Sequence, residues 1–272
     1  MERTVFFLSD RTGITVETLG HSLLTQFGDI HFNKHTLRFI DGPDKVSAAL
    51  EAINRSTRSD GIKPIVFSTL IDAEARRRIA ATDCVFFDFV DTFILPLETE
   101  LGRPSSHTVG QTHGLTDAGG YNRRMDAVNF SLATDDGQAT RDYKLAEVII
   151  LGVSRSGKTP ACLYLALTYG LYAANYPLTQ EDLEDLHLPA ALTGVRDKLF
   201  GLCIDAQRLH QIRQQRQPDS HYASFKQCQY EVRQAEALYR TLAIPTLATT
   251  HMSVEEIATT ILHRMNLPPR RS

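Results

Sequence analysis

The chain has 272 residues, enough for one large domain or two domains of ordinary size. Hydrophobic residues make up 42% of the sequence and charged residues 22%, a balance typical of globular rather than disordered proteins. The net charge of −3 argues against general nucleic-acid binding, and no apolar run is long enough to cross a bilayer. Because the first residues also lack the pattern of a signal peptide, we expect a cytoplasmic protein with neither nucleic acid nor membrane as a partner.

Strand and helix signals alternate through residues 5–90. Predicted strands cover residues 5–8, 36–40, 65–67 and 84–87. The helix after the first strand carries an apolar stripe at Val16, Leu19, Leu23, Leu24 and Phe27. A later helix bears Arg76, Arg77 and Arg78, which we interpret as a solvated face. Strands separated by helices in this way predict βαβ units and a mostly parallel sheet.

The middle of the chain is expected to connect two α/β domains. Residues 96–120 contain repeated glycine and proline and predict a loop-rich connection. A second alternating series follows a helix over 121–132, and its last helix begins with a capping box at Ser253. Its predicted strands are residues 148–151, 199–204 and 244–248. We therefore predict an N-terminal α/β domain over residues 1–120 and a second α/β domain over residues 121–272.

The clearest motif is a glycine loop between an apolar strand and a helix. It reads Gly152-Val153-Ser154-Arg155-Ser156-Gly157-Lys158-Thr159 and is called the phosphate loop below. The two glycines permit a tight turn whose backbone N–H groups face an anion, and the helix dipole adds positive charge. Lys158 supplies a cation for the β-phosphate region, and Thr159 supplies a hydroxyl suited to Mg²⁺. We predict that all eight residues bind a nucleotide, that Thr159 also binds a metal, and that the second domain is a P-loop kinase-like domain. The helix after the loop is expected to pack through Leu163, Leu167 and Leu171.

The phosphate loop does not define the reaction. The Asn-Lys-x-Asp segment that a guanine-nucleotide switch requires is missing downstream. Asp205 follows the predicted strand over 199–204, as either a metal or base carboxylate or a simple helix cap. Arg213 lies in the basic segment beyond it, either stabilising transferred phosphoryl charge or facing solvent. Asp136 lies in Asp135-Asp136-Gly137, a segment that either supplies a metal carboxylate or a base for the target hydroxyl, or simply forms a turn. Lys158, Asp136, Asp205 and Arg213 are the predicted catalytic residues.

Several segments recur in one order in a known family. They are residues 152–160 (GVSRSGKTP), 173–177 (AANYP), 198–202 (KLFGL), 208–213 (RLHQIR) and 222–224 (YAS). Ser9-Asp10, Thr12-Gly13 and Asp135-Asp136-Gly137 also fit. Over nearly its whole length, the chain resembles the regulatory proteins of phosphoenolpyruvate synthase and of pyruvate, phosphate dikinase. It departs from their pattern at Arg11, where a small residue is frequent, and at Thr134, where a histidine is frequent.

This resemblance implies a bifunctional enzyme. Such an enzyme uses ADP as phosphoryl donor to phosphorylate a threonine beside the catalytic histidine of its target, which switches the target off. It removes that phosphate by transfer to inorganic phosphate, the co-substrate, releasing pyrophosphate. The resemblance favours phosphoenolpyruvate synthase over pyruvate, phosphate dikinase as the protein partner. We further hypothesise that one phosphate loop serves both reactions.

Two other functions remain compatible with the residues. A small-molecule kinase could use the same loop and the same arginines, and a nucleotide sensor could bind ADP without turnover. Asp10 and Thr12, after the first strand, are either substrate-binding residues or parts of a helix-capping turn. A homodimer is also compatible with the sequence.

Overall fold

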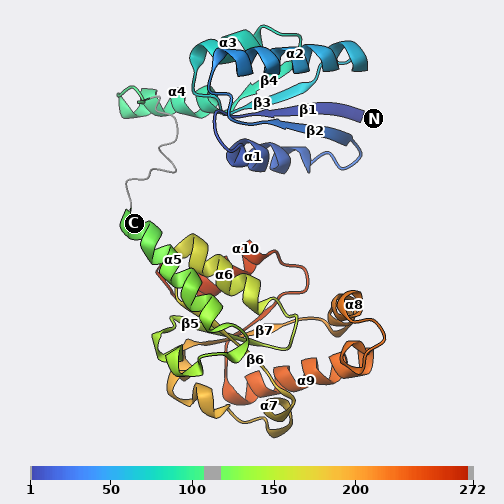
Figure 1. Ribbon diagram of the computed structural model, residues 1–272, viewed down its shortest axis with the longest axis vertical. Helices are drawn as coiled ribbons and strands as arrows, with labels where there is room; N and C mark the ends of the chain where they lie inside the picture. Colours follow the sequence, from blue (N-terminus) through green and yellow to red (C-terminus); the bar gives the residue numbers. More distant parts are fainter. Residues whose placement is uncertain (1, 107–117, 269–272) are drawn as a thin grey trace. The chain divides into compact units, whose positions relative to one another are not determined.

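The computed structural model describes residues 2–106 and 118–268 (Figure 1). The chain divides into two compact units, Met1–Gly114 and Leu115–Ser272. Each unit contains a four-stranded sheet whose paired strands run parallel, with helices connecting them. The α/β fold class predicted from the alternating strand and helix signals is confirmed.

The N-terminal sheet has the strand order β2-β1-β3-β4. Its strands are β1 (Glu2–Leu8), β2 (His31–Leu37), β3 (Ile65–Ser68) and β4 (Val85–Asp88). Its helices are α1 (Ile14–Leu24), α2 (Pro43–Asp60), α3 (Ala73–Ala80) and α4 (Phe89–Leu101). Side chains alternate along β1, so that Val5 and Phe7 pack with α1 while Phe6 and Leu8 pack with α2 and α3. Figure 1 shows α1 on one face of this sheet and α2 and α3 on the other.

The buried face of α1 differs from the apolar stripe expected from sequence. In α1, Leu19 and Leu23 are 43% and 51% exposed, and the buried positions are Val16, Gly20 and Leu24. The helix lies on the sheet through Gly20, where an added Cβ would come within 2.4 Å of the Phe7 ring. Because glycine has no apolar side chain, this contact could not be seen in the apolar periodicity of the sequence. Phe27, the last residue of the predicted stripe, lies beyond α1 and is 55% exposed.

The second strand, β2, spans His31–Leu37 rather than the predicted residues 36–40. Its residues are mostly polar and exposed because β2 is an edge strand, so apolar periodicity could not reveal it.

Arg76 is buried, which corrects the prediction that the arginines of α3 face solvent. Its side chain donates to the carbonyls of Leu70 and Ile71 and forms ion pairs with Asp88 and Asp91. Only 6% of Arg76 is exposed, since α3 directs it against the start of α4. A run of three arginines did not reveal that one of them lies on the inner face.

The predicted loop over residues 96–120 is wrong in its first part. Residues 96–101 belong to α4, which contains Pro96 in its interior. The proline suggested a break, but Asp88 caps the helix start by accepting from two backbone N–H groups, and the helix continues to Leu101. Residues 118–120 also belong to a helix, α5 (Ala118–Ala133), so the prediction is wrong at its end as well. Residues 107–117 lie outside the described part of the chain, and there the expected connection stays a prediction.

The C-terminal sheet has the strand order β6-β5-β7-β8. Its strands are β5 (Val148–Gly152), β6 (Ala173–Pro177), β7 (Leu199–Cys203) and β8 (Thr246–Ala248). Its helices are α5 (Ala118–Ala133), α6 (Lys158–Tyr169), α7 (Gln180–Asp185), α8 (Ala206–Arg216), α9 (Phe225–Leu242) and α10 (Val254–Arg264). Every residue of β5 is buried, as expected of a central parallel strand. In Figure 1, α5, α6 and α10 lie on one side of the sheet and α7 and α9 on the other.

The structure also corrects two predictions in this unit and confirms a third. The buried face of α6 is formed by Ala161, Cys162, Leu165, Ala166 and Tyr169. Of the predicted leucines, Leu167 is 56% exposed, whereas Leu171 is buried in the same core but lies beyond the end of the helix. The strand β6 was not predicted, because its asparagine and proline interrupt the apolar pattern. The predicted capping box is confirmed, with Ser253 and Glu256 bonded reciprocally at the start of α10.

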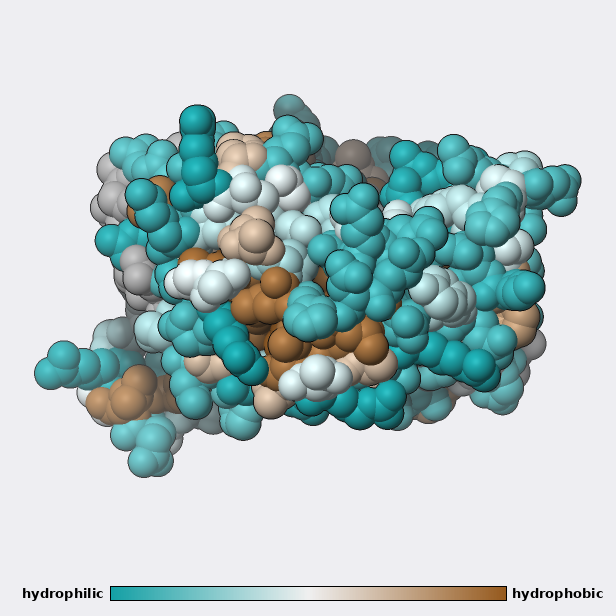
Figure 2. Space-filling view, turned by 90° about the horizontal axis from the view of Figure 1, so that it is seen from below, coloured by the Kyte–Doolittle hydropathy of each residue, from teal (hydrophilic) through white to brown (hydrophobic). Residues whose placement is uncertain are grey.

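The surface in Figure 2 is dominated by hydrophilic side chains around a patch of apolar ones. Within residues 2–106 and 118–268, none of the helices combines the length and the apolar character that crossing a membrane requires.

Candidate active site

The phosphate loop connects β5 to α6, so the predicted context of a strand before and a helix after is confirmed. Gly157 precedes α6 with a φ of 98°, a left-handed conformation that favours glycine. Gly152 permits a close approach, because an added Cβ there would lie 2.4 Å from Ser156 Oγ. Arg155, at the tip, also has a positive φ of 75° and is exposed. These conformations turn the loop tightly around the first turn of α6.

Lys158 is folded onto this loop. Its Nζ donates to the carbonyl of Val153 at 3.1 Å, and only 5% of the residue is exposed. Burial lowers the pKa of Lys158 to about 8, although the negative charges of Asp136 and Asp135 act in the opposite direction. The ammonium group is therefore a desolvated cation that an anionic ligand in the loop would stabilise.

The Asp135–Gly137 turn lies against the phosphate loop. Thr159 donates its hydroxyl to Asp135 Oδ1 at 2.8 Å, and Asn175 Nδ2 donates to the same oxygen at 2.5 Å. Asn175 Oδ1 accepts from the backbone N–H of Asp136 at 3.1 Å. Asn175 is fully buried in β6 and holds Asp135 by its carboxylate and Asp136 by its backbone. Asp136 has a left-handed φ of 49°, a conformation that aspartate tolerates better than most residues.

A small cavity brings the turn and the loop together. It has a volume of about 250 Å³ and is lined by Asp136, Ser154, Arg155, Gly157, Lys158, Thr159 and Pro160. All of these except Pro160 are predicted site residues, and Asp136 and Lys158 meet here although they lie 22 positions apart in the chain (158 − 136). A carboxylate beside a lysine on a tight glycine loop offers a proton acceptor next to an anion site.

The other two predicted catalytic residues do not line this cavity. Asp205 caps α8, accepting from the backbone N–H groups of Gln207 and Arg208, which is the simpler of the two predicted interpretations. Arg213 is completely buried, and its guanidinium donates to the carbonyl of Ser154 at 3.1 Å. Arg213 therefore contacts the loop on the side away from the cavity. A catalytic role for either residue stays a prediction.

Sequence reasoning gave no role to several residues that support the site. Asn175 left one signal, since a polar residue inside a buried apolar segment requires a hydrogen-bonding partner. Glu231 pairs with Arg213, and Tyr222 OH lies 2.8 Å from Ser154 Oγ. Tyr222 lies in the recurring segment over 222–224, which did not indicate a role for it. Glu231 showed no local pattern, because it acts on the loop only through Arg213.

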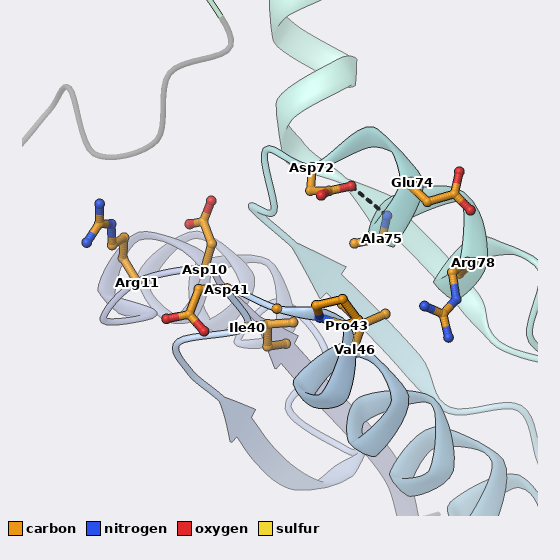
Figure 3. A pocket seen from close by; sticks show the side chains of 11 residues that line it. Asp10, Arg11, Ile40, Asp41, Pro43, Val46, Asp72, Glu74, Ala75 and Arg78 are labelled. Carbon is orange, nitrogen blue, oxygen red and sulfur yellow. Dashed lines mark hydrogen bonds between the residues drawn. The ribbon is translucent and has the colours of Figure 1, made fainter.

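The loop after β1 opens onto a second cavity, of about 520 Å³ (Figure 3). Asp10 lies at its edge, where its carboxylate accepts from Ile71 N–H at 3.3 Å and burial raises its pKa. Figure 3 shows the Arg11 guanidinium directed away from Arg78, so the two cations do not converge. Thr12 is exposed and does not line this cavity. Substrate binding by Asp10 or Thr12 stays a prediction.

Comparison with known proteins identifies the family. A family model described as kinase/pyrophosphorylase matches residues 5–262. A protein of Alkalilimnicola ehrlichii is 54% identical over 98% of this chain and 97% of its own length. Proteins of Halorhodospira halophila and Alcanivorax borkumensis are 53% and 50% identical, over 98% and 99% of both chains. All three bear the provisional name phosphoenolpyruvate synthase regulatory protein. The chain therefore belongs to the kinase/pyrophosphorylase family.

Proposed function

We propose that this chain is a bifunctional serine/threonine-protein kinase and pyrophosphorylase that acts on phosphoenolpyruvate synthase. The family description supports the two activities, and the name of the relatives supports the target. Pyruvate, phosphate dikinase is the alternative target for the same chemistry. The observation that carries the proposal is the cavity that joins Lys158 and Asp136 at the carboxyl end of β5.

In the kinase direction, ADP binds with its β-phosphate against the phosphate loop. The hydroxyl oxygen of the target threonine attacks the β-phosphorus, the bond to the bridging oxygen breaks, and AMP leaves. Asp136 accepts the proton of the hydroxyl. The loop N–H groups and Lys158 stabilise the negative charge on the transferred phosphoryl group.

In the reverse task, inorganic phosphate takes the place of the nucleotide phosphate. One of its oxygens attacks the phosphorus of the phosphothreonine, the bond to the threonine oxygen breaks, and pyrophosphate forms. Asp136 takes a proton from the attacking phosphate and returns it to the leaving threonine oxygen. Both reactions move a phosphoryl group between a threonine oxygen and a phosphate oxygen, so one anion site serves both.

A magnesium ion fits the residues at the start of α6. Thr159 and Asp135 present a hydroxyl and a carboxylate to each other, and both are oxygen ligands that Mg²⁺ prefers. These two residues would hold the ion beside the phosphates, where it supplies neutralisation of phosphate charge when bound. Asn175 orients Asp135 for this role through its own hydrogen bond.

The test is transfer of label from ADP. Purified protein is mixed with ADP labelled in its β-phosphate and with phosphoenolpyruvate synthase, pyruvate, phosphate dikinase or no acceptor. The proposal expects label on a threonine of the synthase, AMP as the other product, and pyrophosphate when the labelled synthase then receives inorganic phosphate. Consumption of ATP without a protein acceptor would support a small-molecule kinase instead, and ADP binding without turnover would support a sensor.

A further inference from the structure

A buried ion pair lies directly behind the phosphate loop. Arg213 of α8 and Glu231 of α9 pair through two hydrogen bonds, of 3.0 Å and 2.6 Å. Arg213 is 0% exposed, and the Glu231 side chain is 14% exposed. Burying two charges is costly, and replacement by apolar residues is frequently neutral or stabilising. A pair of this kind is therefore weak evidence for a role in stability alone.

The pair is connected to the loop through the backbone of Ser154. The Arg213 Nη2 that bonds Glu231 also donates to the Ser154 carbonyl at 3.1 Å. The Nη1 group donates to the carbonyl of Tyr222 at 3.0 Å. The bidentate pairing with Glu231 fixes the orientation of the guanidinium plane. In this orientation one N–H of Arg213 is directed at the Ser154 carbonyl of the loop.

Tyr222 supplies a second connection to the same loop residue. Its ring lies under the guanidinium, 4.1 Å from Arg213 Cζ, and its hydroxyl lies 2.8 Å from Ser154 Oγ. Ser154 is therefore held at its carbonyl by Arg213 and at its hydroxyl by Tyr222. Ser154 also lines the cavity next to Lys158.

We infer that Glu231 and Tyr222 are positioning residues that hold the phosphate loop ready for its anion, Glu231 through Arg213 and Tyr222 through the Ser154 hydroxyl. This inference rests on the proposed function of the loop as the site of ADP and phosphate. Neither residue contacts the cavity, so neither touches the reacting atoms. Their effect is to fix the direction of backbone N–H groups that must converge on a phosphate before it arrives.

The decisive variant is Tyr222→Phe, which keeps the ring under Arg213 and removes only the hydroxyl. We expect its Kd for ADP, measured by calorimetry on the full chain, to rise about tenfold with little change in Tm. Ser154→Ala should raise the Kd similarly, and the double variant should be no weaker than either single variant, because both changes break the same hydrogen bond. Additive effects of the two changes would overturn the role of Tyr222.

Glu231→Gln tests the ion pair. We expect it to raise the Kd for ADP and the KM for inorganic phosphate by about tenfold or more, with a smaller change in kcat. Glu236→Gln is the matched control, since it makes the same charge change at an exposed position of α9 and should leave both constants unaltered. If Glu231→Gln does not fold, the inference is tested by Tyr222→Phe and by the double-mutant cycle of Tyr222→Phe with Ser154→Ala.

Folded Glu231→Gln and Tyr222→Phe proteins with the wild-type Kd for ADP would overturn the inference. That result differs from failure of the proposed function, in which the wild-type protein binds ADP but transfers no label to either target. In that case the binding measurements still test the positioning role. Wild-type protein that binds neither ADP nor phosphate would overturn both.

Discussion

The two sheets have the same topology but different first loops. In each unit the first strand is central and pairs in parallel with the next two strands along the chain. Each first strand leads into a helix whose N-cap is a glycine with a left-handed φ, Gly13 at 81° and Gly157 at 98°. Parallel sheets bind ligands at this edge, where the strand order reverses. The topology therefore offers two loops in equivalent positions.

The residues of the two loops differ in charge. After Gly157 comes a buried lysine whose pKa is held near 8, whereas after Gly13 comes Ile14, which is 61% exposed. The first loop instead has a carboxylate, Asp10, at the cavity, and the guanidinium of Arg11 is directed away from Arg78. A shared fold gives both units a place for a ligand, but only the second loop has the lysine and tight turn of an anion site.

The largest loss of stability is expected at two glycines where a helix packs on a sheet, Gly20 of α1 and Gly201 of β7. Gly20→Ala would bring a Cβ within 2.4 Å of the buried Phe7 ring, whereas Gly201→Ala would reach 2.9 Å from Tyr239. Overpacking of this kind costs about 1–3 kcal/mol, so we expect Gly20→Ala to lose about 3 kcal/mol and Gly201→Ala somewhat less. Urea unfolding of the full chain measures both changes.

Gly28→Ala is the control, because an added Cβ there would meet no described atom within 4 Å. Folded Gly20→Ala protein should keep its affinity for ADP, since the phosphate loop belongs to the other unit. Unchanged stability of Gly20→Ala would contradict the close contact between α1 and β1.

A second comparison adds a methyl group to each loop. Gly152→Ala should raise the Kd for ADP at least about tenfold, because its Cβ would displace Ser156 Oγ and open the turn. The double variant with Ser156→Ala should restore binding, since the buried Ser156 hydroxyl has no hydrogen-bond partner among the described residues. Gly13→Ala, which strains the first loop by placing a Cβ at a left-handed φ and 3.1 Å from Thr36, should leave the Kd unchanged. Failure of Ser156→Ala to rescue would count against this explanation.

The charge of Lys158 predicts a pH dependence for the second loop. Its pKa lies near 8 in the free protein, below the usual 10.5, so the lysine is charged below about pH 8 and neutral above it. ADP affinity should be constant up to about pH 8 and then fall by up to tenfold per pH unit, with proton uptake on binding. The contribution of Lys158 to the stability of the ligand-free protein should rise between pH 8 and 10.5, because the unfolded state binds more protons than the folded state in that range. Calorimetry in buffers of different ionisation enthalpy measures the uptake, and ADP affinity independent of pH would contradict it.

The smallest expected effect is in the first loop. Burial raises the pKa of Asp10, so the folded state disfavours its charge, and stability from this group falls as pH rises through that pKa. Asp10→Asn should therefore stabilise the protein at pH 7 by up to about 1 kcal/mol, with no gain at a pH below the usual pKa. Urea unfolding at the two pH values measures this, and a loss of stability at pH 7 would show that the charged carboxylate is needed.

The sequence predicted what depends on local pattern. The phosphate loop, its strand and its helix follow from glycine spacing and an apolar run, and the capping box at Ser253 follows from two residues. Residues that act across the fold were not predictable in this way. Gly20 replaces an apolar contact by close packing, and Glu231 meets Arg213 only because α8 and α9 pack together. The buried Arg76 likewise depends on carboxylates that follow it by 12 and 15 residues (88 − 76 and 91 − 76).

The central claim is that one phosphate loop serves both reactions, and Lys158→Ala tests it most directly. The variant is assayed for ADP-dependent phosphorylation of phosphoenolpyruvate synthase and for phosphate-dependent removal of that phosphate, with the exposed Lys226→Ala as control. We expect both activities to fall together, by at least about a hundredfold, because the same cation stabilises the transferred group in each. Loss of phosphorylation with wild-type dephosphorylation would contradict the account.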